Sequence, residues 1–219
     1  MHNDRHLHYA VLRLLNNNVT ISVLACISRQ IHIGNDVNTP AIIQQIENGD
    51  SSAFELLVTY FQQPLFGYLG RMGLSQTLAE DIAQETFLRA WQKLASFDAE
   101  RATFSTWLFT IAHRLALNEL SRKGNQVEIN AEPAFDAAED SKASPDDQVD
   151  LQLNQASLRN AMLQLPVNDR NVLALAYTKG LDMRCLAEIE GVSVSAVKVR
   201  VYRAKQRLLT ILEKHHAER

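Results

Sequence analysis

Helical periodicity is the feature of this 219-residue sequence that most restricts its fold. Apolar residues recur at spacings of three and four over residues 39–124, and the pattern returns at residue 151 and continues almost to the end. No alternating apolar and polar series predicts β-strands, and no unit repeats at a fixed period. The sequence therefore predicts an all-α protein.

An acidic segment separates the two helical stretches. Residues 125–150 contain eight Asp or Glu, one Lys and two Pro, with almost no large apolar side chain, which is typical of a solvated linker. The whole chain has a net charge of -3 and this segment has -7, so the remaining residues carry +4. We expect two small helical domains joined by an acidic flexible linker, with positive charge concentrated in the folded parts.

The expected organisation has five parts. Residues 1–38 are an N-terminal extension, either disordered or included through a start codon assigned too far upstream, and a regulatory arm is the alternative. Residues 39–124 form the first domain, 125–150 the linker, 151–214 the second domain and 215–219 a tail. Cys26 and Cys185 lie far apart, which indicates a reducing compartment without a disulfide framework or zinc site. The apolar run at residues 19–27 is too short to span a bilayer, so we expect a cytoplasmic protein without membrane insertion.

The C-terminal stretch has the spacing of a helix-turn-helix. Asp182 is a candidate N-cap for a helix over about residues 182–190. Ala187 is small where two helices would cross, Gly191 provides the turn four residues later, and Val197 follows six residues after that. This pattern predicts two helices packed in the arrangement that places the second one in a DNA groove.

The second helix, from about residue 193, has a surface that suits the major groove. Apolar residues form one stripe, and Lys and Arg flank a short strip on the opposite side. The flanks can reach phosphates on both groove walls, while Val199 can contact a thymine methyl. A basic amphipathic hairpin whose charges only contact water is the alternative. The predicted DNA contacts are Ser195, Lys198, Val199, Arg200, Tyr202 and Arg203.

Residues 78–97 predict an amphipathic helix whose polar side can bind another protein. Ala83, Phe87 and Ala90 belong to its core stripe. An exposed Leu among carboxylates and amides is a composition found at protein interfaces, although a single exposed Leu is ordinary on its own. The predicted docking residues are Asp81, Gln84, Glu85, Leu88 and Gln92.

Residues 101–124 predict a further helix with a mixed polar and aromatic face beside its core stripe. The expected core residues are Phe104, Leu108, Ile111 and Leu115. An aromatic ring, hydroxyls, an amide and a cation can stack unpaired bases and contact the sugar-phosphate chain, whereas burial of Trp107 in the core is the alternative. The predicted single-strand contacts are Thr103, Trp107, Thr110, Arg114 and Asn118.

Four motifs in series resemble the bacterial extracytoplasmic-function sigma factors over about residues 40–214. In order they are D-I-A-Q-E-T-F-L-R-A-W, F-S-T-W-L-F-T-I-A-H-R-L-A-L-N, L-P-V-N-D-R-N-V-L-A-L-A-Y and the helix-turn-helix. The resemblance implies that the first domain is sigma region two, which docks on core RNA polymerase and holds the minus-ten element as single strand. It implies that the second domain is region four, which reads the minus-thirty-five element.

The resemblance also implies the partners of the protein. These are core RNA polymerase, promoter DNA and an anti-sigma factor that restrains the protein until a stress signal releases it. Polymerase performs the chemistry, so we expect no catalytic residue, cofactor or metal in this chain. A stand-alone helix-turn-helix regulator that binds duplex DNA without polymerase is the alternative function.

Four positions depart from the family pattern. His113 and Arg114 stand where the family often has Arg-Asn, and Val199 stands where a small polar residue is common. Glu190 occupies a position that is usually apolar. A cation thus replaces the amide expected at the minus-ten face, and Val199 puts the usual minus-thirty-five contacts in question.

Overall fold

The computed structural model describes residues 38–122 and 156–217, and in these ranges the regular structure consists of helices without β-strands. The all-α prediction is confirmed. The predicted linker at 125–150 and nearly all of the predicted extension at 1–38 lie outside the described residues.

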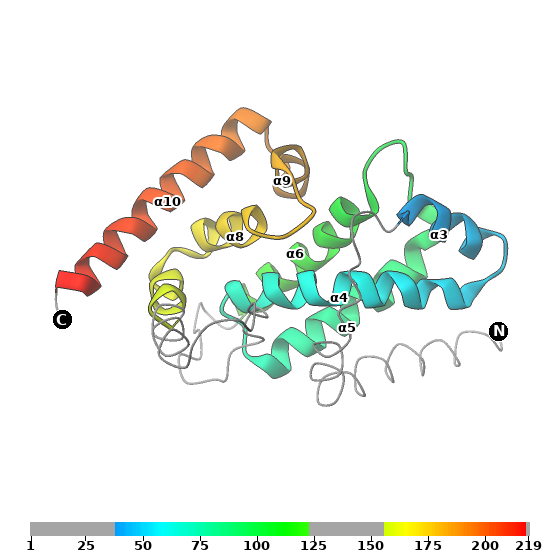
Figure 1. Ribbon diagram of the computed structural model, residues 1–219, viewed down its shortest axis with the longest axis horizontal. Helices are drawn as coiled ribbons and strands as arrows, with labels where there is room; N and C mark the ends of the chain where they lie inside the picture. Colours follow the sequence, from blue (N-terminus) through cyan, green and yellow to red (C-terminus); the bar gives the residue numbers. More distant parts are fainter. Residues whose placement is uncertain (1–37, 123–155, 218–219) are drawn as a thin grey trace, which may run out of the picture.

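The first domain is built from three long helices that pack side by side (Figure 1). A short helix α3 (Thr39–Glu47) and a 3-10 turn (Ser51–Ala53) lead into α4 (Phe54–Arg71). Helix α5 (Gln76–Lys93) and a second 3-10 turn (Leu94–Ser96) precede α6 (Phe104–Arg122). Their shared core is rich in aromatic rings, including Phe54, Phe61, Phe87, Phe104 and Phe109.

The buried side of α6 is wider than its periodicity predicts. Phe104 and Leu108 are buried as expected, but Ile111 and Leu115 are only half-buried. The helix instead buries a set that includes Phe109, Ala112, Ala116 and Leu120. The reason is that α6 packs against α4 and α5 on one side and against α9 of the second domain on another.

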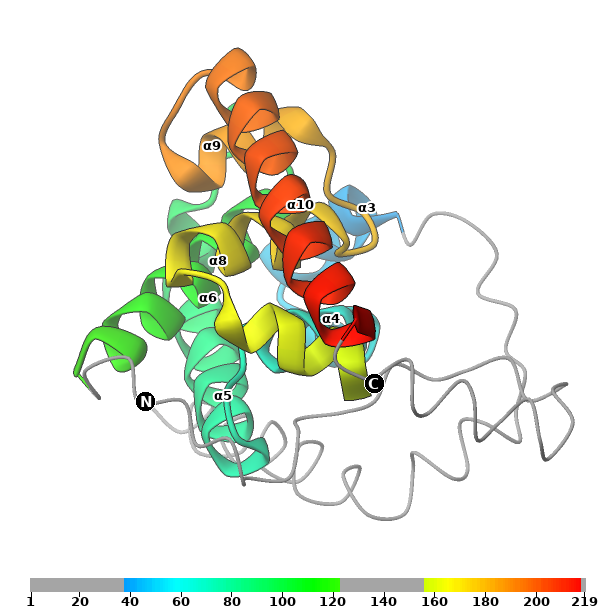
Figure 2. The same cartoon turned by 90° about the vertical axis from the view of Figure 1, so that its left-hand side faces the viewer.

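The second domain is a compact group of helices near the C-terminus. Residues 156–164 are helical, followed by α8 (Val167–Ala176), α9 (Met183–Glu190) and the long α10 (Val194–Ala217). Helix α10 packs on α8 and α9 and lies along the outside of the molecule (Figures 1 and 2).

The helix-turn-helix forms for the local reasons that the sequence indicated. The Asp182 carboxylate accepts hydrogen bonds from the amides of Arg184 and Cys185 at 2.8 and 2.9 Å, and these bonds lower the pKa of Asp182. Gly191 ends α9 with φ 65° and ψ 33°, a left-handed conformation that L side chains disfavour. Ala187 and Val197 are both buried where α9 and α10 meet.

Gly191→Ala is expected to lower the free energy of unfolding by roughly 1 kcal/mol, because a Cβ is strained at this backbone conformation. A Cβ at this position would meet nothing within 4 Å, so the loss would come from the backbone alone. Urea unfolding measures it. Gly191→Asn is the control, since Asn tolerates the left-handed region, and it should retain more stability. An alanine variant as stable as the wild type would contradict this account.

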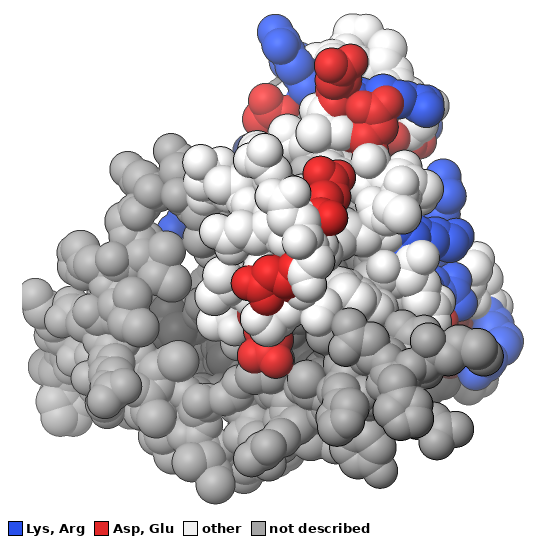
Figure 3. Space-filling model, turned by 90° about the vertical axis from the view of Figure 1, so that its right-hand side faces the viewer, with Lys and Arg blue, Asp and Glu red and all other residues white. Residues whose placement is uncertain are grey.

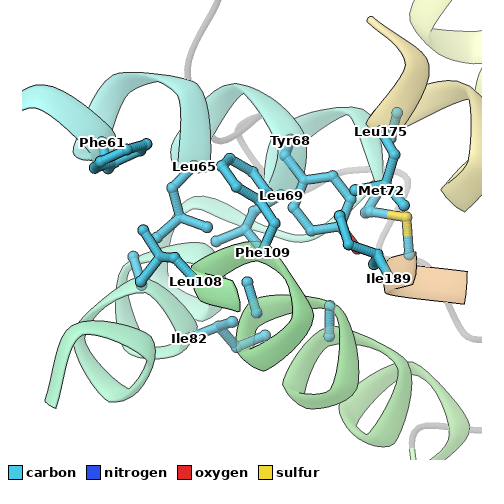
Figure 4. Close-up of a cluster of buried hydrophobic side chains, with 14 of the residues drawn as sticks. Phe61, Leu65, Tyr68, Leu69, Met72, Ile82, Leu108, Phe109, Leu175 and Ile189 are labelled. Carbon is cyan, nitrogen blue, oxygen red and sulfur yellow. The ribbon is translucent and has the colours of Figure 1, made fainter. Parts of the chain in front are cut away.

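The two domains pack directly against each other, which the sequence did not predict. Buried residues of both belong to one hydrophobic cluster. Leu175 of α8 and Ile189 of α9 lie beside Tyr68, Met72 and Phe109 of the first domain (Figure 4). Burial of apolar surface between the two domains favours this packed arrangement.

Candidate nucleic-acid interface

The predicted duplex-reading residues form the exposed face of α10. Val197, Val201 and Ala204 are buried on the inner face, with exposures of 0, 5 and 0%. The outer face carries every residue predicted to contact duplex DNA, all of them exposed: Ser195, Lys198, Val199, Arg200, Tyr202 and Arg203.

The basic side chains of α10 differ in how they are engaged. Arg200 donates to Glu190 at 2.8 Å, Arg207 pairs with Asp169, and the Lys205 ammonium lies 5.3 Å from the centroid of the Tyr177 ring. Among the described residues, Lys198 and Arg203 have no carboxylate within ion-pair distance. These two cations are therefore available to an external anion such as a phosphate.

Charge is distributed unevenly over the molecule. The right-hand face carries scattered Asp and Glu among uncharged residues. Lys and Arg gather along one margin, whereas at the top they are mixed with Asp and Glu (Figure 3). An anionic partner is attracted to the basic parts and not to the whole surface.

The predicted protein-docking residues lie along α5, outside its core stripe. Ala83, Phe87 and Ala90 are fully buried behind this face. Asp81 and Gln92 are exposed, whereas Gln84, Glu85 and Leu88 are half-buried. Glu85 is engaged by Arg89 one turn later, at 2.5 Å. The face thus offers a free carboxylate, amides and part of a Leu side chain.

On the predicted single-strand face of α6, some side chains are packed or hydrogen-bonded within the protein and others are exposed. Trp107 is half-buried and packs at 5.2 Å from Phe97 and 5.6 Å from Phe104 between ring centroids, so it is partly core and partly accessible. The Thr110 hydroxyl donates to the Thr106 carbonyl at 2.7 Å. The exposed members of the predicted set are Thr103, Arg114 and Asn118.

A polar network that sequence reasoning missed links the two domains at Asn171. The Asn171 side-chain oxygen accepts from the Tyr68 hydroxyl at 2.8 Å and lies 3.2 Å from Nδ1 of His113. An amide oxygen only accepts, so Nδ1 of His113 carries the proton. The Asn171 amide nitrogen donates to Glu190, whose other oxygen accepts from Arg200. The family departures at His113 and Glu190 were the only sequence signals for this network.

Burial sets the protonation of two members of this network. It raises the pKa of the Tyr68 hydroxyl, with a smaller contribution from the Glu190 charge, so Tyr68 stays a donor. Burial also lowers the pKa of His113, against the opposing effects of Asn171 and Glu190. Both groups are therefore uncharged near neutral pH.

His113 should make the fold less stable as the pH falls. Because its folded-state pKa lies below the ordinary value of 6.5, the unfolded chain binds the proton more readily as the pH drops through that value. His113→Gln retains an amide donor for Asn171 but does not titrate. We expect the variant to lose less stability than the wild type between about pH 7 and about pH 5 in urea unfolding. Equal losses would show that His113 contributes nothing to the pH dependence.

A buried arginine, Arg170, and a half-buried one, Arg71, reinforce the domain contact. Arg170 is 3% exposed and donates to the carbonyl of Met72 in the first domain at 3.0 Å. It also donates to the carbonyls of Leu163 and Leu165 in its own domain at 3.0 and 3.1 Å. Arg71 donates to the Thr178 hydroxyl across the same contact at 3.0 Å. Burial lowers the pKa of both groups, yet a guanidinium stays charged in proteins.

Within the described residues, no helix is long and apolar enough to cross a membrane. The same part of the chain contains no group of three or more His, Cys, Asp or Glu arranged to hold a metal ion.

The fold and the exposed basic helix place this protein in a class: all-α proteins with a C-terminal helix-turn-helix of the nucleic-acid-binding kind.

Residues 57–126 match the Sigma-70 region 2 family, and residues 155–208 match the family Sigma-70, region 4. The ECF RNA polymerase sigma factor SigW of Bacillus subtilis is 32% identical over 174 residues, covering 76% of this chain and 92% of SigW. The ECF RNA polymerase sigma factor RpoE of Cereibacter sphaeroides is 33% identical over 162 residues, covering 74% and 87%. The chain therefore belongs to the extracytoplasmic-function group of the sigma-70 family of RNA polymerase sigma factors.

Solved structures share this fold. CnrH, solved in complex with the cytosolic domain of CnrY, is similar with a TM-score of 0.60 and 24% identity, over 80% of this chain and 96% of CnrH. RpoE from Bartonella quintana, solved in complex with the anti-sigma factor NepR, has a TM-score of 0.57 and 23% identity, over 73% of this chain and 96% of that RpoE.

Proposed function

We propose that this protein directs core RNA polymerase to a specific set of promoters for transcription initiation. The observation that carries the proposal is the match to sigma regions 2 and 4 in one chain, in that order, with the region 4 match ending in an exposed basic helix. The chain has the two parts that a factor needs when it contacts a promoter at two places.

The proposed work is divided among three helices. On α5, Asp81, Gln84, Glu85, Leu88 and Gln92 dock on core polymerase. On α6, the face from Thr103 to Asn118 holds the melted minus-ten strand, where stacking returns about 1–3 kcal/mol per base. On α10, the outer face reads the minus-thirty-five duplex through base edges and phosphates. Polymerase itself performs the chemistry.

In this proposal the two domains act together, because once one domain has bound the promoter, the linker raises the effective concentration of the other domain near its own DNA element. The domains are residues 39–124 and 151–214, with the acidic linker between them. Each domain alone offers only a small basic surface to DNA. We therefore expect the free protein to bind promoter DNA weakly and to need core polymerase for tight binding.

Restraint by an anti-sigma factor, with release under stress in the cytoplasm, completes the proposal. Its support is that the similar RpoE of Bartonella quintana was solved with the anti-sigma factor NepR. In this chain, the direct packing of the two domains presents a compact body to such a partner.

Reconstituted transcription tests the function. Transcripts are mapped after overproduction of the protein, and the upstream DNA is then transcribed with core polymerase, with and without the purified protein. We expect specific transcripts only when both are present. Tight binding to the same duplex without polymerase, together with no polymerase-dependent transcript, would instead support a stand-alone helix-turn-helix regulator.

A further inference from the structure

Glu190 joins the DNA-reading helix to the domain interface through its two carboxylate oxygens. One oxygen accepts from the Asn171 amide nitrogen and the other accepts from Arg200 at 2.8 Å. The Glu190 side chain is only 10% exposed, whereas that of Arg200 is 50% exposed. The carboxylate is therefore held inside the protein while the guanidinium can still reach outward.

The first domain determines which way the Asn171 amide points. Its oxygen faces two donors from the first domain, the Tyr68 hydroxyl and Nδ1 of His113. With the oxygen occupied in this way, the amide nitrogen is directed to Glu190. The domain contact thus holds Glu190 in the position from which it binds Arg200.

We propose that Glu190 is a positioning residue for promoter recognition, which withholds Arg200 from duplex DNA while the domains are packed together and releases it when they separate. The proposal rests on the proposed function of α10 as the minus-thirty-five reader. When the domains part, Asn171 loses both donors and Glu190 becomes hydrated. A hydrated ion pair is weak, so phosphates and base edges can then take Arg200.

The coupling acts in both directions. If separation of the domains frees Arg200 for DNA, then DNA bound to Arg200 must favour separation by the same factor. Side chains that never touch DNA, such as Tyr68, are consequently expected to change the affinity of α10 for duplex.

A double-mutant cycle tests whether Glu190 acts through Arg200. Wild type, Glu190→Gln, Arg200→Ala and the double variant are compared for binding to a fluorescent duplex, selected at low salt from random-sequence DNA by the wild-type protein. We expect Glu190→Gln to tighten binding about tenfold in the wild-type background, the size of one lost charge-assisted hydrogen bond. In the Arg200→Ala background, Glu190→Gln should change duplex binding by less than about twofold.

Glu188→Gln is the matched control, because Glu188 is an exposed carboxylate on the same helix. It removes the same charge, and we expect a change of less than about twofold in both backgrounds, as for a screened surface charge. If Glu190→Gln tightened binding equally with and without Arg200, or if Glu188→Gln matched it, the effect would be general electrostatics and the proposal would be wrong.

Tyr68→Phe tests the link to the first domain. It removes one donor to Asn171 at a residue that is fully buried and lies in α4. We expect duplex binding to tighten about threefold when Glu190 is present and to stay unchanged in the Glu190→Gln background. Thermal unfolding confirms that each variant is folded. Unchanged binding in both backgrounds would overturn the coupling.

The outcomes separate this proposal from the proposed function. Run-off transcription with core polymerase is measured in parallel on the wild-type protein. Absence of transcription contradicts the sigma function, whatever the cycle shows. An additive cycle in a protein that does support transcription contradicts only the role of Glu190.

Discussion

Arg170→Ala is expected to lower the free energy of unfolding by about 3 kcal/mol, because two buried carbonyls and one partly buried carbonyl lose the cation that binds them. Those carbonyls belong to Met72, Leu163 and Leu165, so the loss affects both the second domain and its contact with the first. The variant regains the cost of burying a charge, but it leaves the carbonyls without donors and creates a cavity.

Urea unfolding followed by circular dichroism measures this loss. Arg184→Ala is the control, since Arg184 is an exposed arginine in the same domain and should change stability by less than about 0.5 kcal/mol. Arg170→Lys should fall between the wild type and the alanine variant, because an ammonium cannot span three acceptors as a planar guanidinium does. A loss equal to that of Arg184→Ala would mean that the carbonyls find other donors.

Asp81→Lys is expected to weaken binding to core polymerase about thirtyfold, which is the effect of a single interface hot spot. Asp81 is exposed on α5, two helical turns before the half-buried Leu88 on the same side, and the buried stripe lies on the other side of the helix. Charge reversal there should therefore leave the fold intact. Polymerase-dependent transcripts should fall in parallel.

Glu47→Lys is the matched control for this prediction, because Glu47 is an exposed carboxylate on α3, outside the proposed docking face. Duplex binding by the free protein should be the same in both variants, since α10 is untouched. If both reversals weakened polymerase binding equally, the effect would come from net charge and the docking face would lie elsewhere.

Much of the second domain could be predicted from local signals. The Asp182 side chain accepts hydrogen bonds from two backbone amides in the first turn of α9, and Gly191 ends the helix in a left-handed conformation. Both ends of α9 are therefore determined by residues within or next to the helix. The exposed face of α10 likewise follows from its period, with Val197 and Val201 on the inside. The docking and single-strand roles of α5 and α6 remain predictions, although the exposure of Asp81 and Arg114 is consistent with them.

The inner surroundings of α6 could not be predicted in the same way. Periodicity located Phe104 and Leu108 correctly but assigned Ile111 and Leu115 to the core in place of Phe109 and Ala112. The spacing of apolar residues identifies the buried side of a helix when a single neighbouring element covers that side. A second neighbour, here α9, widens the buried side beyond what one stripe can indicate.

The sequence by itself determined that this protein is helical, where helix α10 begins, and which family it resembles, because these depend on spacings within single helices and on short motifs. Only the tertiary structure decided that Tyr68, His113, Asn171 and Glu190 meet. Tyr68 and Asn171 are 103 residues apart, and His113 and Asn171 are 58 apart. Contacts over such separations depend on how the helices of two domains pack, and the pattern within one helix does not specify its neighbours.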